Sequence, residues 1–385
     1  MEAAGIPERA SENYERAARA RAENARPERT IPLMLKALAL VPLETRSRTT
    51  VLRAVQLLAD SPVGGEPGKL VEMVRRLSTH LLARADIEQD ELVEALLDLA
   101  RIQRATLHFH EAQQLLLKTQ ALAEQAPHKL ATVLLALADT QIAVGDFEPA
   151  VATLRRFDRV VTDPTAAQRH EALVIAAHAH AQKGDRAVAL GLLEAAAELE
   201  RGQEESRALR SAQVRALVYA LGNEWSESGA AAAQAANLAR SLGRLQQEAA
   251  YRHYEGEAMT YLGEYARAYA AFRSALALSR DLGSERWVNR NQMLLAYLEG
   301  REDTARARQR VGECLVFAER RHDTQDVAKG RLLLGFLERA DANEVAAVRE
   351  FQLARQVASA IGHRLLVAEC DAALQAAQPT SEPLA

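Results

Sequence analysis

The chain has 385 residues, of which 48% are hydrophobic and 4% aromatic, and its formal net charge at pH 7 is -4. This balance gives no electrostatic reason to expect a nucleic acid or an anionic membrane surface as the main partner. The two cysteines, Cys314 and Cys370, are far apart and form no CxxC or Cys/His spacing. Neither a disulfide framework nor a zinc site is therefore expected, and a reducing compartment fits the chain.

The amino-terminal segment alternates arginine with glutamate and lacks the apolar core of a signal peptide. No stretch of the sequence approaches the roughly 20 apolar residues that a membrane-spanning helix needs. These features predict a cytoplasmic protein without membrane insertion. Arginine greatly outnumbers lysine, which is a compositional hint of a GC-rich bacterial genome.

A six-residue phrase recurs through the second half of the chain and ends at Gly243, Gly283, Asp323 and Gly362, so its period is 39 to 40 residues. A constant period between 20 and 50 residues is typical of solenoids, in which each unit is too small to bury its own apolar face. The length of such a chain reflects the number of repeats.

Tight turns lie between the recurring phrases, and each joins two stretches whose apolar residues fall at helical spacing. A glycine in each turn is expected to end one helix in the left-handed conformation, and the Asp or Asn that follows several of them to cap the next helix. These glycines are Gly145, Gly184, Gly222, Gly263 and Gly300. In chain order the predicted helical hairpins are residues 10–42, 44–84, 87–125, 128–162, 165–201, 204–242, 245–282, 285–321 and 323–361, followed by one helix over 363–377.

The hairpin over residues 245–282 carries the clearest motif, in which small residues and aromatics alternate around the turn. Its members are Gly256, Gly263, Tyr265, Ala268, Phe272 and Ala275. In order and spacing this hairpin resembles the tetratricopeptide repeat (TPR), and the hairpin over 323–361 keeps Gly335, Ala347, Phe351 and Ala354. The hairpin over 285–321 departs most, because Arg308 and Gly312 stand where alanine and an aromatic are expected.

The resemblance implies an all-α protein, a right-handed α-solenoid of stacked antiparallel hairpins whose groove is lined by the first helix of each pair. TPR arrays hold extended or helical peptide segments in that groove. The chain is accordingly divided into an amino-terminal helical block over 1–62, a repeat array over 63–362, a capping helix over 363–377 and a disordered tail over 378–385. In the capping helix, Leu365, Leu366, Ala368, Ala372 and Leu374 are expected to face inward, and Glu369, Asp371 and Gln375 outward.

Two segments are irregular in composition. Residues 60–68 hold two prolines and three glycines, which favours a long loop inside one hairpin, with a hinge after the amino-terminal block as the alternative. Residues 229–236 hold almost nothing larger than a methyl group, which predicts the closest helix approach of the array. There, Ala232→Leu is expected to overpack the interface at a cost of roughly 1 to 3 kcal/mol.

For each sequence motif that could indicate catalysis or a cofactor, a purely structural role is the better interpretation. The segment 64–69 is similar to a P-loop in composition but lacks its first glycine and the Ser or Thr after the lysine. The histidine pairs 108/110 and 178/180 are two residues apart, so on a helix they point about 200° away from each other and cannot close on one ion. Neither an enzyme, a cofactor nor a metal site is expected.

An arginine-rich run is interspersed with acidic residues, which favours a solvated helix with ion pairs over an RNA or phosphate site. Its arginines are Arg301, Arg306, Arg308, Arg310, Arg320 and Arg321.

The candidate partner-binding residues are those that the repeat frame places on the first helices, toward the groove. They are His178, Gln182, Arg210, Gln213, His253, Glu257, Tyr261, Arg290, Tyr297 and Lys329. They mix both charges with Tyr and His, as expected of a peptide site with a few polar anchors.

The first hypothesis is a non-enzymatic scaffold or adaptor that binds a protein or peptide partner in this groove. The alternative is a regulator whose curvature changes when a peptide or small ligand binds. Self-association stays open, because exposed helix faces at either end of a solenoid can stack on a second copy.

Overall fold

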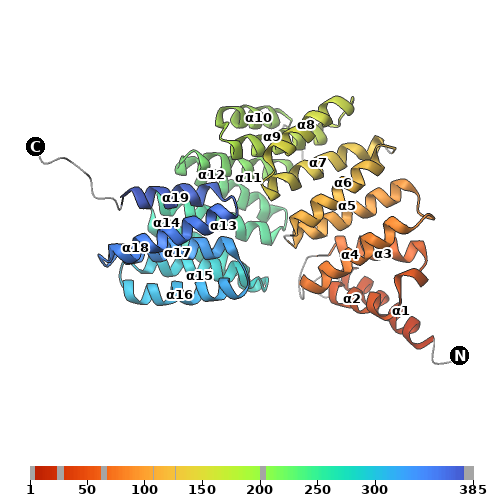
Figure 1. The fold of residues 1–385 in the computed structure, drawn as a ribbon, viewed down its shortest axis with the longest axis horizontal. Helices are drawn as coiled ribbons and strands as arrows, with labels where there is room; N and C mark the ends of the chain where they lie inside the picture. Colours follow the sequence, from red (N-terminus) through yellow and green to blue (C-terminus); the bar gives the residue numbers. More distant parts are fainter. Residues whose placement is uncertain are drawn as a thin grey trace, which may run out of the picture. The chain divides into compact units, whose positions relative to one another are not determined.

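The structure is a computed structural model, and it describes residues 5–23, 30–61, 67–106, 108–125, 127–199 and 205–376 (Figure 1). Every regular element among these residues is a helix, so the predicted all-α class is confirmed. No helix in these ranges is long and apolar enough to cross a membrane. The chain forms two compact units, Met1–Ala179 and His180–Ala385, each with its own hydrophobic clusters.

The first unit contains the amino-terminal helices. They are α1 (Gly5–Glu23), α2 (Thr30–Leu40), the 3-10 helix η2 (Leu43–Thr45), α3 (Arg48–Ala59), α4 (Pro67–Ala83), α5 (Gln89–Ala105), α6 (Phe109–Ala123), α7 (Pro127–Val144), α8 (Phe147–Val160) and most of α9 (Ala166–Lys183). The predicted division at residue 62 falls on residues 62–66, which lie outside the described ranges, as does the first half of the segment 64–69 that is similar to a P-loop.

The second unit contains the helices that follow. They are α10 (Arg186–Glu198), α11 (Glu205–Leu221), α12 (Trp225–Ser241), α13 (Leu245–Tyr261), α14 (Tyr265–Asp281), α15 (Glu285–Glu299), α16 (Thr304–Arg320), α17 (Thr324–Ala340), α18 (Glu344–Ala360) and α19 (Arg364–Ala376). Each predicted hairpin thus contains an odd-numbered helix followed by an even-numbered one, and α19 stands alone. The predicted tail over 378–385 lies outside the described residues.

A common frame of buried residues explains why the even-numbered helices pack alike. Counted from the first residue of α14, a small residue at the fourth position, a large one at the eighth and a small one at the eleventh are buried: Ala268, Phe272 and Ala275. Helix α18 repeats the frame with Ala347, Phe351 and Ala354.

The same frame corrects the expectation for the hairpin over 285–321. Its buried residues are Ala307, Val311 and Cys314, one position before the residues that the sequence frame assigned. Helix α15 has 15 residues, two fewer than α13, and the turn 300–303 after it is one residue longer than the turn 262–264, so α16 begins one residue earlier in the repeat than α14 does. Arg308 is therefore half-buried beside the packed face and pairs with Glu338 of α17, and the hairpin packs in the common way.

Two glycines in the first helices accommodate the aromatic rings of the second. A Cβ atom on Gly256 would lie 2.7 Å from Cε1 of Phe272, and one on Gly335 would lie 2.4 Å from Cε1 of Phe351. Both rings are fully buried, so they have no free space into which to move. The glycine and aromatic positions of the motif are therefore one packing unit.

The turn glycines are only partly as predicted. Gly145, Gly184 and Gly263 have φ angles of 96°, 96° and 76°, in the left-handed region that favours glycine. In the turn at Gly222 the left-handed residue is instead Asn223, with φ of 58°. Gly300 has φ of -62° and a helical conformation, so its predicted left-handed cap is wrong.

The side-chain caps predicted after these glycines are also largely wrong. The side chains of Asp146 and Asp185 accept no capping hydrogen bond, whereas Asp303 accepts one from the backbone N–H of Arg306 at 2.9 Å. The backbone of the turn instead closes the preceding helix: the N–H of Asp146 donates to the carbonyl of Gln141, in the last turn of α7, at 2.8 Å. This is the backbone pattern of a Schellman end, which needs no side chain.

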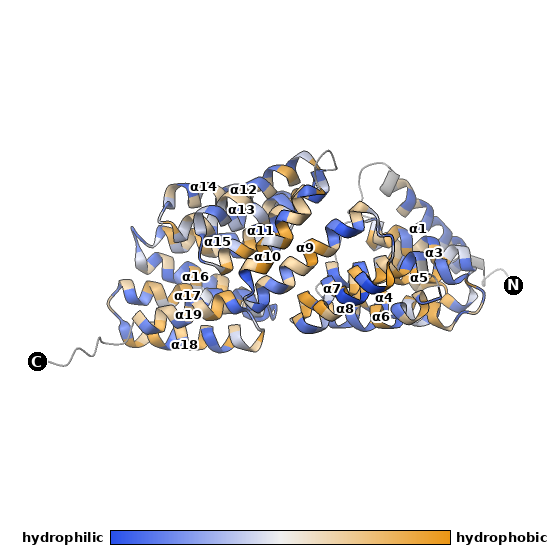
Figure 2. Ribbon diagram, turned by 90° about the horizontal axis from the view of Figure 1, so that it is seen from above, coloured by the Kyte–Doolittle hydropathy of each residue, from blue (hydrophilic) through white to orange (hydrophobic). Residues whose placement is uncertain are grey.

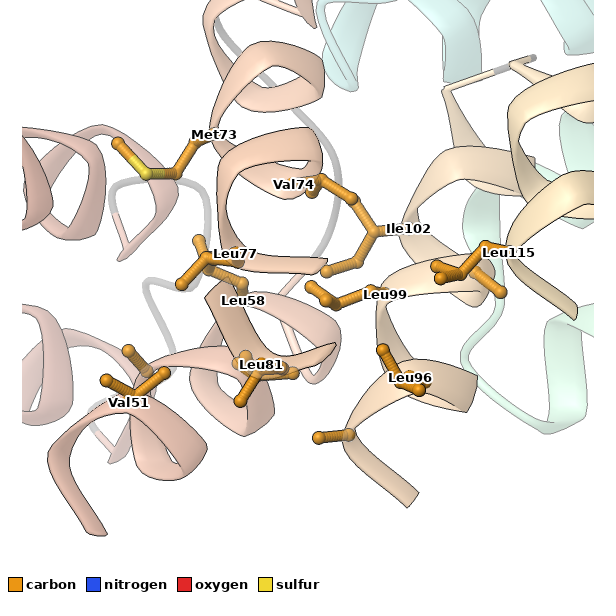
Figure 3. Packing of buried hydrophobic residues seen from close by; sticks show 14 of the residues in the cluster. Val51, Leu58, Met73, Val74, Leu77, Leu81, Leu96, Leu99, Ile102 and Leu115 are labelled. Atoms are coloured by element: carbon orange, nitrogen blue, oxygen red, sulfur yellow. The ribbon is translucent and has the colours of Figure 1, made fainter. Parts of the chain in front are cut away.

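Hydrophobic residues from successive helices are buried in the interior of each unit. Hydrophobic and hydrophilic residues alternate along the ribbon of most helices, as amphipathic packing requires (Figure 2). In the first unit, Leu77 and Leu81 of α4 meet Leu96 and Leu99 of α5 (Figure 3). These side chains are 0% exposed, so each contributes roughly 1.5 to 3 kcal/mol of hydrophobic burial.

Alanines make a close helix contact in the second unit. Ala232 of α12 is fully buried, and a Cβ atom on Gly229 of the same helix would lie 2.4 Å from the Cε atom of Met259 of α13. Small residues along α12 allow this approach, as the sequence predicts.

Helix α19 presents a different face from the predicted one. Its buried residues are Leu366, Cys370 and Ala373, whereas Ala368 and Ala372 are exposed. Glu369, which was expected to face outward, is only 10% exposed because its side chain pairs with Lys329 of α17. The inner face of α19 is thus polar as well as apolar.

Candidate functional site

The odd-numbered helices form one layer of the second unit. Helix α15 contacts α17, and α17 contacts α19. Within residues 205–376, the even-numbered helices α12, α14, α16 and α18 do not contact one another as closely. Helices that touch across successive repeats lie on the shorter, inner side of a curved stack. Side chains on this layer that do not enter the core therefore face one common surface.

Lys329 is the centre of a charged cluster on this surface. Its Nζ atom lies 3.2 Å from Oε1 of Glu257 on α13 and 3.2 Å from Oε2 of Glu369 on α19. The hydroxyl of Tyr261, also on α13, lies 3.5 Å from the same nitrogen. One ammonium group thus joins three helices.

The environment of the Lys329 cluster keeps Lys329 and Glu257 ionised. Burial works against the charged lysine, but Glu369, Tyr261 and Glu257 outweigh it and hold the pKa of Lys329 well above its usual value. Burial likewise opposes the charged form of Glu257, yet Lys329, His253 and Arg290 lower its pKa to about 2. The carboxylate and the ammonium stabilise each other where water is largely excluded.

His253 lies beside this cluster as a neutral, buried ring. Its Nδ1 atom lies 3.0 Å from the Oδ1 atom of Asn291, and its Nε2 atom lies 3.7 Å from Oε2 of Glu257. The side chain is 2% exposed, and burial lowers the pKa of His253 to about 4 in spite of the glutamate. The ring acts as a hydrogen-bonding core residue at neutral pH.

A second buried ion pair extends the polar surface along α15 and α17. The Nε atom of Arg290 donates to Oδ1 of Asp326 at 2.5 Å, and its Nη2 atom donates to Oε1 of Gln325 at 3.2 Å. Nε2 of Gln325 in turn lies 3.1 Å from Nε2 of His363, at the start of α19. Arg290 is 8% exposed, so its main contribution is to hold α15 against α17.

Aromatic side chains border the charged cluster and remain accessible. Tyr261 stacks on Trp225 with ring centroids 3.9 Å apart, and Tyr254 meets Trp287 edge-on at 6.2 Å. The two tyrosines are 41% (Tyr254) and 40% (Tyr261) exposed, although burial raises the pKa of both hydroxyls. Solvent reaches these rings while protein crowds their hydroxyls, as expected on a concave wall.

The structure brings together half of the predicted binding residues. His253, Glu257, Tyr261, Arg290 and Lys329 lie in or next to the Lys329 cluster. Of these, Tyr261 has the most accessible side chain, whereas His253 and Arg290 are buried. Their assignment as partner-binding residues stays a prediction.

The other five predicted residues lie elsewhere. Arg210 donates to Gln213 at 3.2 Å on α11, and the ring of Tyr297 packs against Phe336. Gln182 lies half-buried near the end of α9. His178 belongs to the first unit.

Sequence reasoning missed Tyr254, Trp287 and Glu369, which complete this surface. Tyr254 and Trp287 are among the few aromatics of the chain and occur on first helices, which is a signal that composition offered. Glu369 gave no signal, because only its contact with Lys329, 40 residues earlier, distinguishes it from a surface acid.

The arginine-rich run forms ion pairs, as predicted, but these pairs are not the i, i+4 pairs of one helix that were expected. Arg310 pairs with Glu299, and Arg321 pairs with Glu285 at 2.8 Å. Arg301 lies over the ring of Tyr265, 3.9 Å from its centroid. Most of these partners lie on neighbouring helices and not four residues away on the same helix.

Among the described residues, no group of three or more His, Cys, Asp or Glu side chains is placed to hold a metal ion. Both cysteines are buried, and burial raises the pKa of the Cys314 thiol to about 11 and that of Cys370 to about 12. Neither sulfur has the thiolate character that a nucleophile needs at neutral pH.

Comparison with solved structures identifies the architecture. A signal-transduction ATPase from Pyrococcus horikoshii with a tetratricopeptide repeat sensor matches 90% of this chain at 16% identity and a TM-score of 0.54, and this chain spans 49% of that protein. The apo form of the quorum sensor NprR from B. thuringiensis matches 90% of this chain and 98% of its own at 10% identity and a TM-score of 0.60. This chain has the fold of a TPR solenoid.

A third TPR-like structure is a Rap protein complexed with Competence and Sporulation Factor, which covers 86% of this chain and 97% of its own at 13% identity and a TM-score of 0.51. No protein-family model and no curated protein matches the chain. The resemblance that the sequence motif carries is thus confirmed for the fold, and in the TPR frame the Lys329 cluster lies on the first helices α13 and α17 and on the last helix α19.

Proposed function

We propose that this TPR solenoid is a non-enzymatic protein-interaction module that binds a peptide segment of a partner on the inner surface of its second unit. The observation that carries the proposal is the pair of accessible tyrosines, Tyr254 and Tyr261, beside the charged Lys329 cluster. Exposed aromatics next to fixed polar groups are the composition of binding hot spots.

The polar part of this surface is suited to hold peptide groups in place. Glu257 and Glu369 offer carboxylate acceptors for peptide N–H groups or basic side chains, while the hydroxyl of Tyr261 lies close to the same charges. Because these groups are fixed by contacts among three helices, little ordering is required when a ligand binds. A peptide is therefore the ligand class that fits both the aromatics and the anchors.

The alternative function is a ligand-responsive regulator, and one contact favours it. Lys329 joins α17 to α13, which lies two repeats earlier, and a ligand that competes for Glu257 would release this bridge. Binding would then change the curvature of the unit. Small-angle scattering with and without a bound peptide separates the two functions, because a rigid scaffold keeps its radius of gyration.

The test of the proposed function is a selection of displayed random peptides on the full chain. Peptides that it enriches should bind the Tyr254→Ala/Tyr261→Ala variant at least about tenfold more weakly, because each tyrosine is expected to be an anchor worth more than about 1 kcal/mol. Tyr269→Ala is the matched control, since Tyr269 is similarly exposed but lies on the even-numbered helix α14. Equal binding to all three proteins would place the site elsewhere.

The choice of these residues follows from burial. Replacing Arg290 would leave the buried carboxylate of Asp326 without its partner, so a loss of binding would be confounded with a loss of folding. The two tyrosines are exposed by about two-fifths, and their replacement leaves the ion pairs intact. Unchanged thermal unfolding of the double variant confirms that the binding assay reports on the surface alone.

A further inference from the structure

The first unit contains a pocket of about 330 Å³ between α5 and α7, separate from the surface described above. Its volume lies at the lower end of the range of small-molecule sites. Leu97, Ala100 and Leu116 supply apolar wall, and acidic and basic side chains of α5 and α7 supply the rest. The pocket therefore suits a ligand with a short aliphatic part and at least one charge.

Cross-helix ion pairs already occupy two of the basic groups of this pocket. Nζ of Lys129 lies 2.8 Å from Oε2 of Glu94, and Arg104 pairs with Asp139. Both pairs join α5 to α7. Because these cations have carboxylate partners, the pocket has no free positive charge that would select an anion.

Asp98 is the acidic group that lacks a full counter-charge. Its Oδ1 atom lies 2.8 Å from Arg101, but that guanidinium is shared with Asp60 at 3.7 Å. Burial raises the pKa of Asp98, and the carboxylates of Asp60 and Glu94 raise it further against the effect of Arg101. With four carboxylates (Asp60, Glu94, Asp98 and Asp139) and three cations (Arg101, Arg104 and Lys129), the local charge is -1.

One donor in the pocket also lacks a partner. Nε of Arg104 is buried and donates no hydrogen bond, although buried donors are normally satisfied. Although this atom is enclosed, the side chain of Arg104 is 30% exposed, so a rotation of the guanidinium would let a ligand that carries an acceptor oxygen satisfy it. Since Asp98 and Arg104 are six residues apart on one helix, about 9 Å of axial rise separates them.

We propose that this pocket binds an aliphatic primary ammonium group, with the ammonium at Asp98, the alkyl chain against Leu97 and Leu116, and an acceptor oxygen of the same ligand at Nε of Arg104. A divalent metal ion is a poor alternative, because no group of three or more His, Cys, Asp or Glu in the described ranges is placed to hold one. The lysine side chain of a peptide meets all three requirements, whereas a free alkylamine meets only the first two.

The test uses three probes on the full chain, with dissociation constants from ligand-observed NMR. Nα-acetyl-lysine N-methylamide should bind saturably, and its norleucine analogue, which lacks the ammonium, should bind at least about tenfold more weakly, a difference of about 1.4 kcal/mol. Equal binding of the two would overturn the proposal. Butylamine shows whether the ammonium group comes from a peptide or from a free amine. If butylamine binds more weakly than the lysine probe, the site is assigned to peptide lysines, and if the two bind equally, it is assigned to free amines.

Two variants test the residue that we assign. Asp98→Asn keeps the size of the side chain and should weaken the lysine probe by about tenfold, whereas the matched control Glu94→Gln, at the edge of the pocket, should have a smaller effect. Thermal unfolding checks the fold of Asp98→Asn, which is expected to be retained because burial opposes the ionised aspartate. A folded Asp98→Asn protein that binds the probe as the parent does would refute the assignment. The Tyr254→Ala/Tyr261→Ala protein should bind the probe normally, since its changes lie in the other unit.

Discussion

Removal of the ammonium at Lys329 tests how the inner surface of the second unit is held together. In Lys329→Met the side-chain length is kept, but Glu257 and Glu369 lose the cation that lies 3.2 Å from each of them. The pKa of Glu257 is lowered from 4.5 to about 2 in the folded protein. At about 1.36 kcal/mol for each pKa unit, this lowering corresponds to roughly 3 kcal/mol of stability at pH 7, and Lys329 is the largest of the charges that cause it.

The sign of the pH dependence follows from the lowered pKa of Glu257. An acid whose pKa is lowered by folding stabilises the fold above its unfolded pKa, and this contribution is lost as the pH falls through the folded value. Between pH 7 and pH 3 the contribution of Glu257 should fall from roughly 3 to roughly 1 kcal/mol. The destabilisation caused by Lys329→Met should therefore be less than half as large at pH 3 as at pH 7.

The assay is urea-induced unfolding followed by far-UV circular dichroism at the two pH values. Lys118→Met, at an exposed position of α6, is the control and should change the free energy of unfolding by less than about 0.5 kcal/mol. Adding Glu257→Gln to Lys329→Met should restore part of the loss, because the unpaired buried charge is then removed. A loss below about 1 kcal/mol at pH 7, or an equal loss at both pH values, would refute this account of the cluster.

Three further predictions concern packing and protonation. Ala232→Leu should lower the free energy of unfolding by about 1 to 3 kcal/mol, because Ala232 is fully buried and clusters with Ala216 of α11; an unchanged thermal midpoint would contradict this packing. Gly335→Ala should destabilise by a similar amount, because the added methyl group meets the ring of Phe351, and this outweighs the gain in helix propensity of about 1 kcal/mol. Gly312→Ala is its control: nothing lies within 4 Å of the new methyl group, so thermal unfolding should show equal or higher stability. His253 should remain neutral down to about pH 5 in an NMR titration, because its pKa is lowered to about 4. The fold should consequently lose stability as the pH falls from 6.5 toward 4, and a ring that titrates near 6.5 would show that His253 is accessible.

The helical hairpins were predictable because their signals are local. A glycine that packs against an aromatic of the next helix, as Gly256 does against Phe272, recurs at a fixed interval, and the apolar residues around it follow the helical period. The error of frame arose where a helix and a turn change length. Helix α15 is two residues shorter than α13 and the turn after it is one residue longer, and this net change moved Arg308 and Gly312 out of the positions that the repeat assigned to them.

The candidate site was harder to predict because its contacts are not local. Lys329 meets Tyr261, 68 residues earlier, and Glu369, 40 residues later. Whether a charged residue on a first helix is accessible or buried depends on the partner that a later repeat supplies, and periodicity contains no such information. For this reason His253 and Arg290 appeared as binding residues, although their side chains are enclosed.

The bridge through Lys329 also alters how the second unit should come apart. In a solenoid whose repeats contact only their neighbours, stability is close to a sum over adjacent pairs, so the last helix can fray without disturbing the rest. Here the terminal helix α19 and the distant helix α13 share one ammonium group, and its release exposes two carboxylates at once. Amide hydrogens of α13 and α19 should consequently exchange in a common opening event, so that the carboxyl-terminal end of the array melts as a block and not one hairpin at a time.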